Sequence, residues 1–312
     1  MTTRGFATST TAELRPSAKI NLTLGVLGRR ADGYHDLRSL AVGVDLRDTL
    51  RCTLANRPGI ELCCDVPGIS KDENLAFCAA RRLAEHVGLE PAVRLDLRKN
   101  IPLGSGLGGG SSDAAATLRL CNALWNAGLD DVQLGEIGAQ IGSDVPLFFA
   151  LPAARMTGRG ERAEKVPIHW SGWVLLVFAG PLVATREVYA AWRPSHSGAT
   201  REEAEAALLS AKTADAMNEL LFNDLEPAVF CVSPEVAKLH RVLTEKGFGP
   251  LRVSGAGSAL FRLFDDYASA ERIARSIREL KSSLRVELAA APVGAGSINH
   301  EETDDEDYRS TH

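Results

Sequence analysis

The chain has 312 residues, of which 45% are hydrophobic and 24% charged, the balance of a globular protein long enough for about two domains. The final stretch SINHEETDDEDYRSTH carries six acidic residues against one arginine and accounts for the whole formal net charge of −5. The neutral remainder argues against a nucleic-acid partner, which needs clustered excess Lys and Arg. The longest apolar run, WVLLVFAGPLVA, is too short for a bilayer, and the start MTTRGFATSTTAELRP has no apolar region that would predict a signal peptide. We therefore expect a cytoplasmic protein with no membrane partner.

The cysteines predict no metal site. The six cysteines form no C-x-x-C pair and do not lie near paired histidines. Reduced thiols packed as small hydrophobic residues are the better interpretation.

The first half mixes strands and helices. Apolar residues at every second position predict strands in AELRPSAKINLTLGVLGRR, DLRSLAVGVDLRDTLRCTLA and AVRLDLRKN. Helical spacing predicts a helix in DENLAFCAARRLAEHVG that ends at Gly88. Two further helices are predicted in SSDAAATLRLCNALWNAG, with a serine cap, and in DDVQLGEIGAQIG.

The second half repeats this mixture. WVLLVFAG, PLRVSGAGSALFRLF and SLRVELAAAPV predict strands, the second one interrupted by a glycine turn, and three helical segments lie among them. Because strands and helices do not alternate strictly, we predict an α+β fold with two layers in each of two domains. The expected division is a disordered N-terminus at 1–12, domains at 13–165 and 166–297, and a disordered acidic tail at 298–312.

The stretch PLGSGLGGGSSDAAA, residues 102–116, predicts an anion site. Glycines allow successive N–H groups to point into one concavity, and the positive end of a helix dipole follows directly. A polyphosphate is the ligand that needs so many donors. The alternative is a flexible turn ahead of a helix, which five glycines and two serines make the weaker interpretation.

Other phosphate loops fit this stretch less well. It satisfies G-x-G-x-x-G, but no strand ending in an acidic residue follows, as a dinucleotide fold requires. It has no Gly-Lys-Ser/Thr of a Walker loop, and the chain has no H-R-D or D-F-G of a protein kinase.

Three ordered motifs resemble those of the GHMP kinases, a family of small-molecule kinases. These are PSAKINLTLGV near the start, IPLGSGLGGGSSDAA, and LRVSGAGSALF near the end. The pieces RADGYHDLRSL, IGSDVPLFF and FNDLEP resemble one subfamily, whose substrate carries a cytidine diphosphate group. The likeness runs from about Ser17 to Val293. It implies a two-domain fold with an active site between the domains, ATP as phosphoryl donor, and Mg²⁺.

The resemblance assigns the catalytic roles. Asp144 in GSDVP is the expected base, although a turn aspartate before Pro146 would look the same. Lys19 in SAKIN would stabilise the transferring phosphoryl group and keep the base ionised. Asn21 lies two residues further on the same strand face and would bind substrate or hold the base.

Three side chains are expected to recognise the cytosine base. Tyr34 and Tyr189 match positions whose rings sandwich the base, and His35 would hydrogen-bond its edge. Tyr189 rests on the loosest part of the resemblance.

The nucleotide site is expected to use residues from four segments of the chain. Ser112 is also a candidate contact for Mg²⁺, although Asp144 is the one evident carboxylate nearby. The predicted ATP-binding residues are Asn74, Leu75, Lys99, Pro102, Gly104, Gly106, Leu107, Gly108, Gly109, Gly110, Ser111, Ser112, Ser254, Gly255 and Gly257.

The expected activity is therefore transfer of a phosphoryl group from ATP to a small cytidyl-bearing alcohol, by a monomer or weak homodimer. A GHMP kinase of mevalonate or homoserine type is the nearest alternative, but neither needs a nucleobase clamp such as GYH. A non-catalytic nucleotide-binding protein on this fold should lack the base and the lysine, and a dinucleotide oxidoreductase is a more distant alternative.

Overall fold

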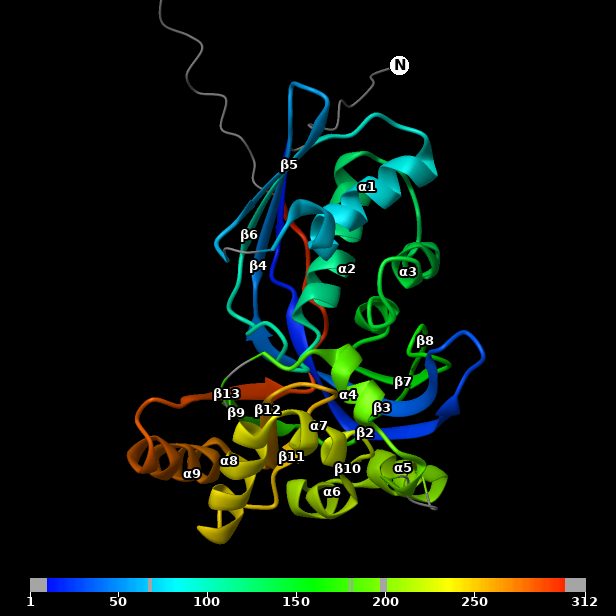
Figure 1. Cartoon of the computed structure of the whole chain (residues 1–312). Coiled ribbons are helices and arrows are strands. Elements are labelled where there is room, and N and C mark those ends of the chain that lie inside the picture. The colour runs from blue at the N-terminus through cyan, green and yellow to red at the C-terminus, as the bar shows by residue number, and fades with distance from the viewer. Residues whose placement is uncertain (1–9, 67–68, 179, 181, 197–200, 301–312) are drawn as a thin grey trace, which may run out of the picture.

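The computed structural model describes residues 10–66, 69–178, 180, 182–196 and 201–300. Within this part of the chain the strands form three sheets, and no described helix is long and apolar enough to cross a membrane. In Figure 1 the first sheet and its helices form the upper half, and the remaining helices cover the lower half.

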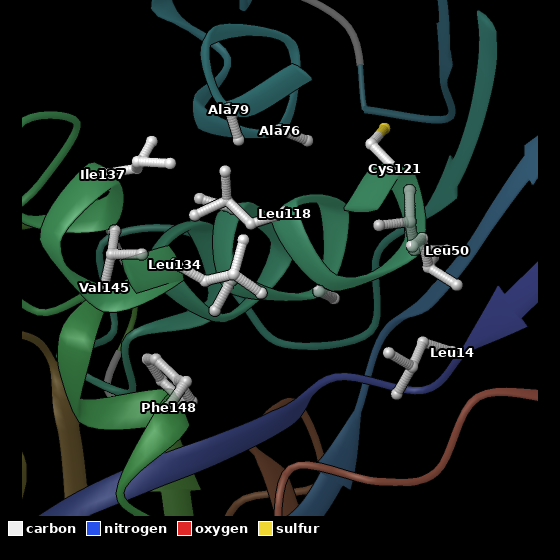
Figure 2. Packing of buried hydrophobic residues seen from close by; sticks show 14 of the residues in the cluster. Leu14, Leu50, Ala76, Ala79, Leu118, Cys121, Leu134, Ile137, Val145 and Phe148 are labelled. Carbon is white, nitrogen blue, oxygen red and sulfur yellow. The ribbon is translucent and has the colours of Figure 1, made fainter. Parts of the chain in front are cut away.

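The first sheet carries the N-terminal helices on one face. Its strand order is β14 (Asn299–His300), β1 (Thr11–Leu14), β4 (Thr49–Leu54), β6 (Ala92–Arg98) and β5 (Gly59–Cys64). The covering elements are η1 (Lys71–Glu73), α1 (Leu75–Val87), α2 (Gly109–Leu124), α3 (Asp131–Ala139) and η2 (Pro146–Phe149). Figure 2 shows the buried cluster of this half: Leu118 lies among the helices, toward Ala76 and Ala79, and Leu14 and Leu50 lie on the strand side.

The second and third sheets pack face to face. The second has the order β10 (Phe222–Asn223), β2 (Ser17–Arg29), β3 (His35–Arg47), β7 (Ala153–Thr157) and β8 (Arg162–Lys165). The third has the order β11 (Arg252–Val253), β12 (Ala259–Phe264), β9 (Gly172–Phe178) and β13 (Arg285–Ala291). Because β10 pairs with β2, the second half of the chain extends a sheet of the first half.

The sequence WVLLVF reads as a continuous apolar run because β9 is buried on both faces. Val174 and Leu176 point into the core shared with the second sheet, whereas Leu175 and Val177 pack on the other side. This alternation is the two-residue period of a strand.

Helices cover the outer face of the third sheet. This layer contains α4 (Thr185–Ala191), α7 (Glu226–Val232), α8 (Pro234–Glu245) and α9 (Tyr267–Leu280). The remaining elements are η3 (Pro194–His196), α5 (Arg201–Ser210) and α6 (Ala214–Leu220).

Mixed sheets and helices confirm the predicted α+β class, but both predicted tails were too long. Thr11 and Ala12 belong to β1, and Asn299 pairs with Glu13, because antiparallel ladder bonds at a sheet edge order both segments. The remaining parts of the predicted tails, 1–9 and 301–312, lie outside the described residues. The predicted boundary at 165/166 falls between β8 and β9 and stays a prediction.

The predicted serine cap of α2 was wrong. The N-cap is Gly108, whose φ of 72° is in the left-handed region, and the first helical bond runs from Ser112 N to Gly108 O at 2.9 Å. Glycine adopts this conformation without the steric penalty of a β-carbon, so the helix begins inside the glycine run. Ser111 and Ser112 therefore lie in its first turn.

Candidate active site

Strand β2 presents two buried polar side chains on one face. Ala18, Ile20 and Leu22 point into the core between the sheets, so Lys19 and Asn21 point to the opposite face. Lys19 Nζ donates a hydrogen bond to Asn21 Oδ1 at 2.7 Å. Burial lowers the pKa of Lys19, and the neighbouring Asp144 carboxylate opposes this shift.

Asp144 lies opposite this lysine. It follows α3 in the turn before η2, and its Oδ2 is 3.6 Å from Lys19 Nζ. The Asp144 side chain is 37% exposed whereas that of Lys19 is 4% exposed, so the carboxylate faces solvent and the ammonium stands behind it. An exposed carboxylate held by a buried cation can accept a proton from an entering hydroxyl.

The glycine loop passes directly beside Lys19. Lys19 N donates to Leu107 O at 2.9 Å, and Leu107 is fully buried. A β-carbon at Gly108 would lie 3.0 Å from both Lys19 Cε and the Phe148 ring. The loop backbone, the lysine and the start of α2 thus meet at one point, where N–H groups and the helix dipole favour an anion.

The third glycine motif holds the loop from the other side. Ser254 Oγ donates to Gly106 O at 3.1 Å, and Ala259 N donates to Ser105 O at 3.1 Å. A β-carbon at Gly257 would be only 1.9 Å from Gly106 N. Backbone packs against backbone here, which explains why both motifs consist of glycines.

The third motif also touches strand β2. A β-carbon at Gly255 would lie 3.1 Å from Asn21 Oδ1 and 3.4 Å from Lys19 Nζ. The structure therefore brings together the predicted residues of all three glycine-containing motifs. We call Lys19, Asn21, Asp144 and residues 102–112 the reacting centre.

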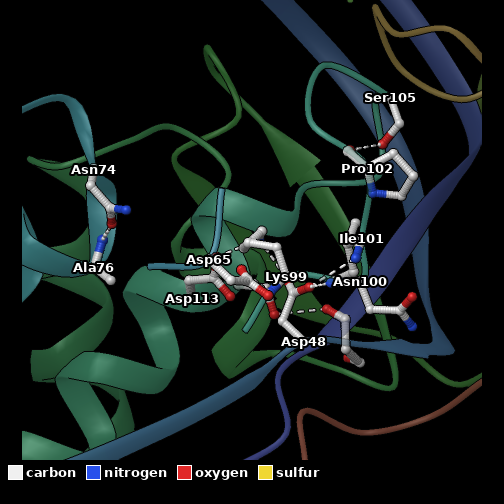
Figure 3. Close-up of polar contacts among 12 residues, drawn as sticks. Asp48, Asp65, Asn74, Ala76, Lys99, Asn100, Ile101, Pro102, Ser105 and Asp113 are labelled. Atoms are coloured by element: carbon white, nitrogen blue, oxygen red, sulfur yellow. Dashed lines mark hydrogen bonds and ion pairs between the residues drawn. The ribbon is translucent and has the colours of Figure 1, made fainter. Parts of the chain in front are cut away.

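Lys99 is enclosed behind the loop (Figure 3). Its ammonium pairs with Asp48 and with Asp113, and all three side chains are almost fully buried. Although burial opposes the charge, the two carboxylates raise the pKa of Lys99. Burial, together with Asp48 and against the pull of Lys99, raises the pKa of Asp113 to about 7. The Lys99 ammonium is thus already paired inside the protein, and a contact of Lys99 with nucleotide stays a prediction.

Asp48 was missed by sequence reasoning. Besides Lys99, it accepts hydrogen bonds from the backbone N–H of Asn100 and Ile101, the latter at 2.8 Å. It therefore fixes the chain immediately before the glycine loop. Nothing in VDLRDTL distinguishes Asp48 from an ordinary turn aspartate, because its partners lie about 50 residues away in the sequence, in the segment that follows β6.

The predicted magnesium contact fits poorly. Ser112 is buried, and its Oγ donates to Ser17 O at 2.7 Å. Among the described residues, no group of three or more His, Cys, Asp or Glu side chains could hold a metal. The Ser112 hydroxyl is already hydrogen-bonded to the backbone, and a magnesium site formed by protein side chains normally includes carboxylates.

The predicted adenine-side residues lie at the start of α1. Asn74 is the N-cap of this helix, and its side chain accepts from Ala76 N at 3.0 Å (Figure 3). The Leu75 side chain contacts the loop, since a β-carbon at Gly110 would lie 3.6 Å from Leu75 Cδ1. The structure therefore places Leu75 against the start of α2, and a contact of Asn74 with the nucleotide stays a prediction.

A cluster of rings lies near the reacting centre. His35, the first residue of β3, stacks on Tyr189 with ring centroids 5.2 Å apart and meets Trp192 edge-on at 5.3 Å. Burial and the charge of Arg29 lower the pKa of His35, so the imidazole is neutral at pH 7. Burial and the charge of Asp144 raise the pKa of Tyr189, which stays a neutral phenol. The ring cluster is thus within electrostatic reach of the candidate base.

Tyr34 does not face Tyr189 in this structure. Its ring is 52% exposed and lies under the Arg159 guanidinium, 5.0 Å from the ring centroid. His35 covers one face of Tyr189, so a stacked base would use the other face or displace the imidazole. We call Tyr34, His35, Arg159, Tyr189 and Trp192 the substrate rim.

Arg159 and Trp192 are rim residues that sequence reasoning missed. Arg159 lies in the turn between β7 and β8, next to Gly160, where a β-carbon would lie 3.5 Å from Asp144 Oδ1. Trp192 is mostly buried, and its indole N–H has no partner within the described part of the chain. The glycines in TGRGE could have indicated a turn around Arg159, whereas nothing in the sequence distinguishes Trp192 from an ordinary core residue.

Known proteins are similar to this chain over most of its length. Residues 74–150 match the model of the GHMP kinases N terminal domain, and residues 204–282 match that of the GHMP kinases C terminal region. The 4-diphosphocytidyl-2-C-methyl-D-erythritol kinase of Thermodesulfovibrio yellowstonii is 39% identical over 82% of this chain and 90% of its own length.

Solved structures agree with this likeness. A crystal structure of 4-(cytidine 5'-diphospho)-2C-methyl-D-erythritol kinase superposes with a TM-score of 0.74 at 33% identity, covering 89% of this chain and 98% of that one. The homoserine kinase of Cytophaga hutchinsonii has the same TM-score at 16% identity over 96% of this chain and 99% of its own, which shows a shared fold alone. With two matched domain models and close relatives along most of its length, the chain belongs to the GHMP kinase family.

Proposed function

We infer that the chain is an ATP-dependent 4-diphosphocytidyl-2-C-methyl-D-erythritol kinase of the non-mevalonate isoprenoid precursor pathway. It transfers the γ-phosphoryl group of ATP to the 2-hydroxyl of this alcohol, giving the 2-phosphate and ADP. The identity of 39% to a relative of that name supports the substrate. The observation that carries the chemistry is the Lys19 ammonium, 3.6 Å from Asp144 and packed against the glycine loop.

Each part of the reacting centre has one task. The loop N–H groups and the N-terminus of α2 hold the triphosphate, as positive dipole ends hold anions. Asp144 orients the attacking hydroxyl and accepts its proton, and Lys19 stabilises the negative charge that spreads over the transferring oxygens. Because the transition state of phosphoryl transfer is loose, orientation matters more than base strength.

Magnesium is proposed to come with ATP. The residues around Ser112 do not form a metal site of their own, so the phosphates would supply the oxygens that Mg²⁺ prefers. No step of the proposed reaction is therefore assigned to a protein-held metal.

The substrate rim is proposed to bind the cytidine diphosphate end of the substrate. Tyr34 and Tyr189 supply ring faces, and the neutral imidazole of His35 can donate one hydrogen bond and accept another. The Arg159 guanidinium adds a positive charge beside Tyr34, which suits a diphosphate. Binding far from the reacting hydroxyl can position that hydroxyl against Asp144.

Release of ADP tests the proposal. The purified protein should release ADP with the cytidyl alcohol and not with mevalonate or homoserine, and the product should carry one added phosphate by mass spectrometry. Turnover of mevalonate or homoserine in preference to the cytidyl alcohol would assign another GHMP kinase activity, and ATP binding without turnover of any of them would leave a nucleotide-binding protein.

A further inference from the structure

Strand β2 contains a bulge directly after Asn21. Asn21 pairs with Ala41 of β3 and Thr23 pairs with Leu40, so β2 uses one more residue than β3 at Leu22. Such an extra residue disrupts the regular ladder and re-aims nearby side chains.

Two hydroxyl side chains bind the backbone at this bulge. Thr23 Oγ1 accepts from Leu40 N at 2.9 Å, and Ser39 Oγ donates to Thr23 O at 2.5 Å. Both side chains are buried, where an unpaired backbone group would be costly. The two hydroxyls therefore compensate for the local irregularity of the ladder.

The Ser39 hydroxyl has a second partner, the side-chain amide of Asn21. Its oxygen accepts a hydrogen bond from Asn21 Nδ2 at 2.8 Å, while Asn21 Oδ1 accepts from Lys19 Nζ at 2.7 Å. An ammonium has no acceptor, so the amide oxygen must face Lys19 and the amide nitrogen must face Ser39. The direction of the whole chain of bonds is fixed because Ser39 gives its own hydrogen to a carbonyl.

We propose that Ser39 is a positioning residue for phosphoryl transfer, which locks the Asn21 amide so that its oxygen holds the Lys19 ammonium beside Asp144. The inference rests on the proposed function of the reacting centre. The sequence left two roles open for Asn21, to bind substrate or to hold the base. Because its amide oxygen and nitrogen both have protein partners, the proposal assigns it instead to support of the lysine. Without the Ser39 hydroxyl the NH₂ group of Asn21 loses its acceptor, so the amide is free to rotate and no longer holds its oxygen against the ammonium.

Matched variants separate positioning from support of the bulge. Ser39→Ala removes both bonds of the hydroxyl, Thr23→Val removes only the bond to Leu40 N, and Ser39→Thr keeps a hydroxyl. We expect Ser39→Ala to lower kcat about tenfold or more, as small misplacements in an active site do, with little change in KM for ATP. Thr23→Val should lower Tm but keep kcat, and Ser39→Thr should restore most of the activity.

A double-mutant cycle with Asn21→Ala tests the route of the effect. If Ser39 acts through the Asn21 amide, Ser39→Ala should change kcat less than about twofold in the Asn21→Ala background. A full additional loss in that background, or an equal loss of kcat in Thr23→Val, would show that Ser39 merely supports the bulge and would overturn the proposal.

An NMR experiment on the Lys19 ammonium tests the positioning role without any substrate. The Lys19 ammonium should give a slowly exchanging signal in lysine-labelled protein, identified by its loss in Lys19→Arg, because its protons are buried and hydrogen-bonded. The signal should persist in Thr23→Val and be lost in Ser39→Ala. An unchanged signal in Ser39→Ala would refute the positioning role, whereas a wild-type protein inactive on the cytidyl alcohol would refute only the proposed function.

Discussion

The reacting centre and the substrate rim are built in opposite ways. The centre is held by buried bonds that close on one another, such as Lys19 to Asn21 and Ser254 to Gly106. The rim is held by contacts between rings and a guanidinium at about 5 Å, such as 5.2 Å between the ring centroids of His35 and Tyr189, and its Tyr34 is half exposed. A centre of this kind tolerates almost no change in shape, whereas a rim can adapt to the base that it receives.

This contrast predicts that changes in the centre abolish function and that changes in the rim tune specificity. Asp144→Asn should lower kcat by about 10²- to 10⁴-fold, the usual contribution of a positioned proton acceptor, with ATP affinity nearly unchanged. Single-turnover kinetics and ATP titration would measure the two effects. Asp131→Asn, at the exposed start of α3, is the matched control and should keep full activity. Near-normal kcat in Asp144→Asn would remove Asp144 from the mechanism.

The support behind the loop should be as sensitive as the loop itself. Asp48→Ala leaves one buried and one partly buried N–H group without an acceptor and Lys99 with one carboxylate fewer, which should cost about 3–5 kcal/mol of unfolding free energy. Asp48→Asn should cost less, because its amide oxygen still accepts from both N–H groups. Urea denaturation would measure both, and equal stability of the alanine variant and the wild type would contradict the assigned role.

Glycines of the loop should be irreplaceable where backbone meets backbone. Gly106→Ala places a β-carbon 1.9 Å from Ser254 O at a φ of 80°, so we expect a loss of about 3 kcal/mol in stability together with weaker ATP binding. Gly135→Ala is the control, since its nearest neighbour would be 3.9 Å away and alanine favours the helix α3. Calorimetry should therefore show opposite shifts in Tm for the two variants, and a Gly106→Ala protein as stable as Gly135→Ala would contradict the packing argument.

The rim should give smaller and more selective effects. Stacking of a base on an aromatic ring contributes about 1–3 kcal/mol, so Tyr34→Ala should reduce kcat/KM for the cytidyl substrate about tenfold with little change in KM for ATP. Tyr34→Phe should be milder, because the ring face under Arg159 is kept. His35→Ala should relax discrimination against a uridyl analogue, which presents a different hydrogen-bonding edge. If Tyr34→Ala weakened the use of ATP as much as that of the cytidyl substrate, the tyrosine would lie outside the cytidyl site.

The smallest expected effect is a shift in pH dependence. Burial lowers the pKa of Lys19, so its ammonium is lost at a lower pH than the usual lysine value of about 10.4. The kcat should accordingly fall on the alkaline side before pH reaches about 10. Between the lowered folded pKa and the unfolded value, the unfolded chain binds more protons, so the contribution of Lys19 to stability rises with pH while activity falls.

Lys19→Arg separates the two consequences. Arginine stays charged throughout this range, so the variant should have a lower kcat without the alkaline loss. The prediction is tested by measuring kcat and Tm of both proteins over the same range of pH. An alkaline limb that persists unchanged in Lys19→Arg would have to come from another group.

Much of the reacting centre could be predicted from the sequence because its residues lie in short local motifs. Two glycine stretches, SAKIN and GSDVP each contain their candidate residues within a few positions, and backbone geometry dictates glycine where two of these chain segments touch. The strand and helix types followed from apolar periods of two and of 3.6 residues. The exact start of α2 did not, because a left-handed glycine rather than a serine side chain begins that helix.

The sequence by itself determined the family, the phosphate loop and the pair of Lys19 and Asp144 as candidates. Only the tertiary structure decided which polar groups support them, namely Asp48 behind the loop and Ser39 behind Asn21. It also decided that Tyr34 faces Arg159 while His35 covers Tyr189. The physical reason is the range of the interactions: a motif encodes its own backbone geometry, whereas a buried charge or a stacked ring depends on partners that only folding brings near.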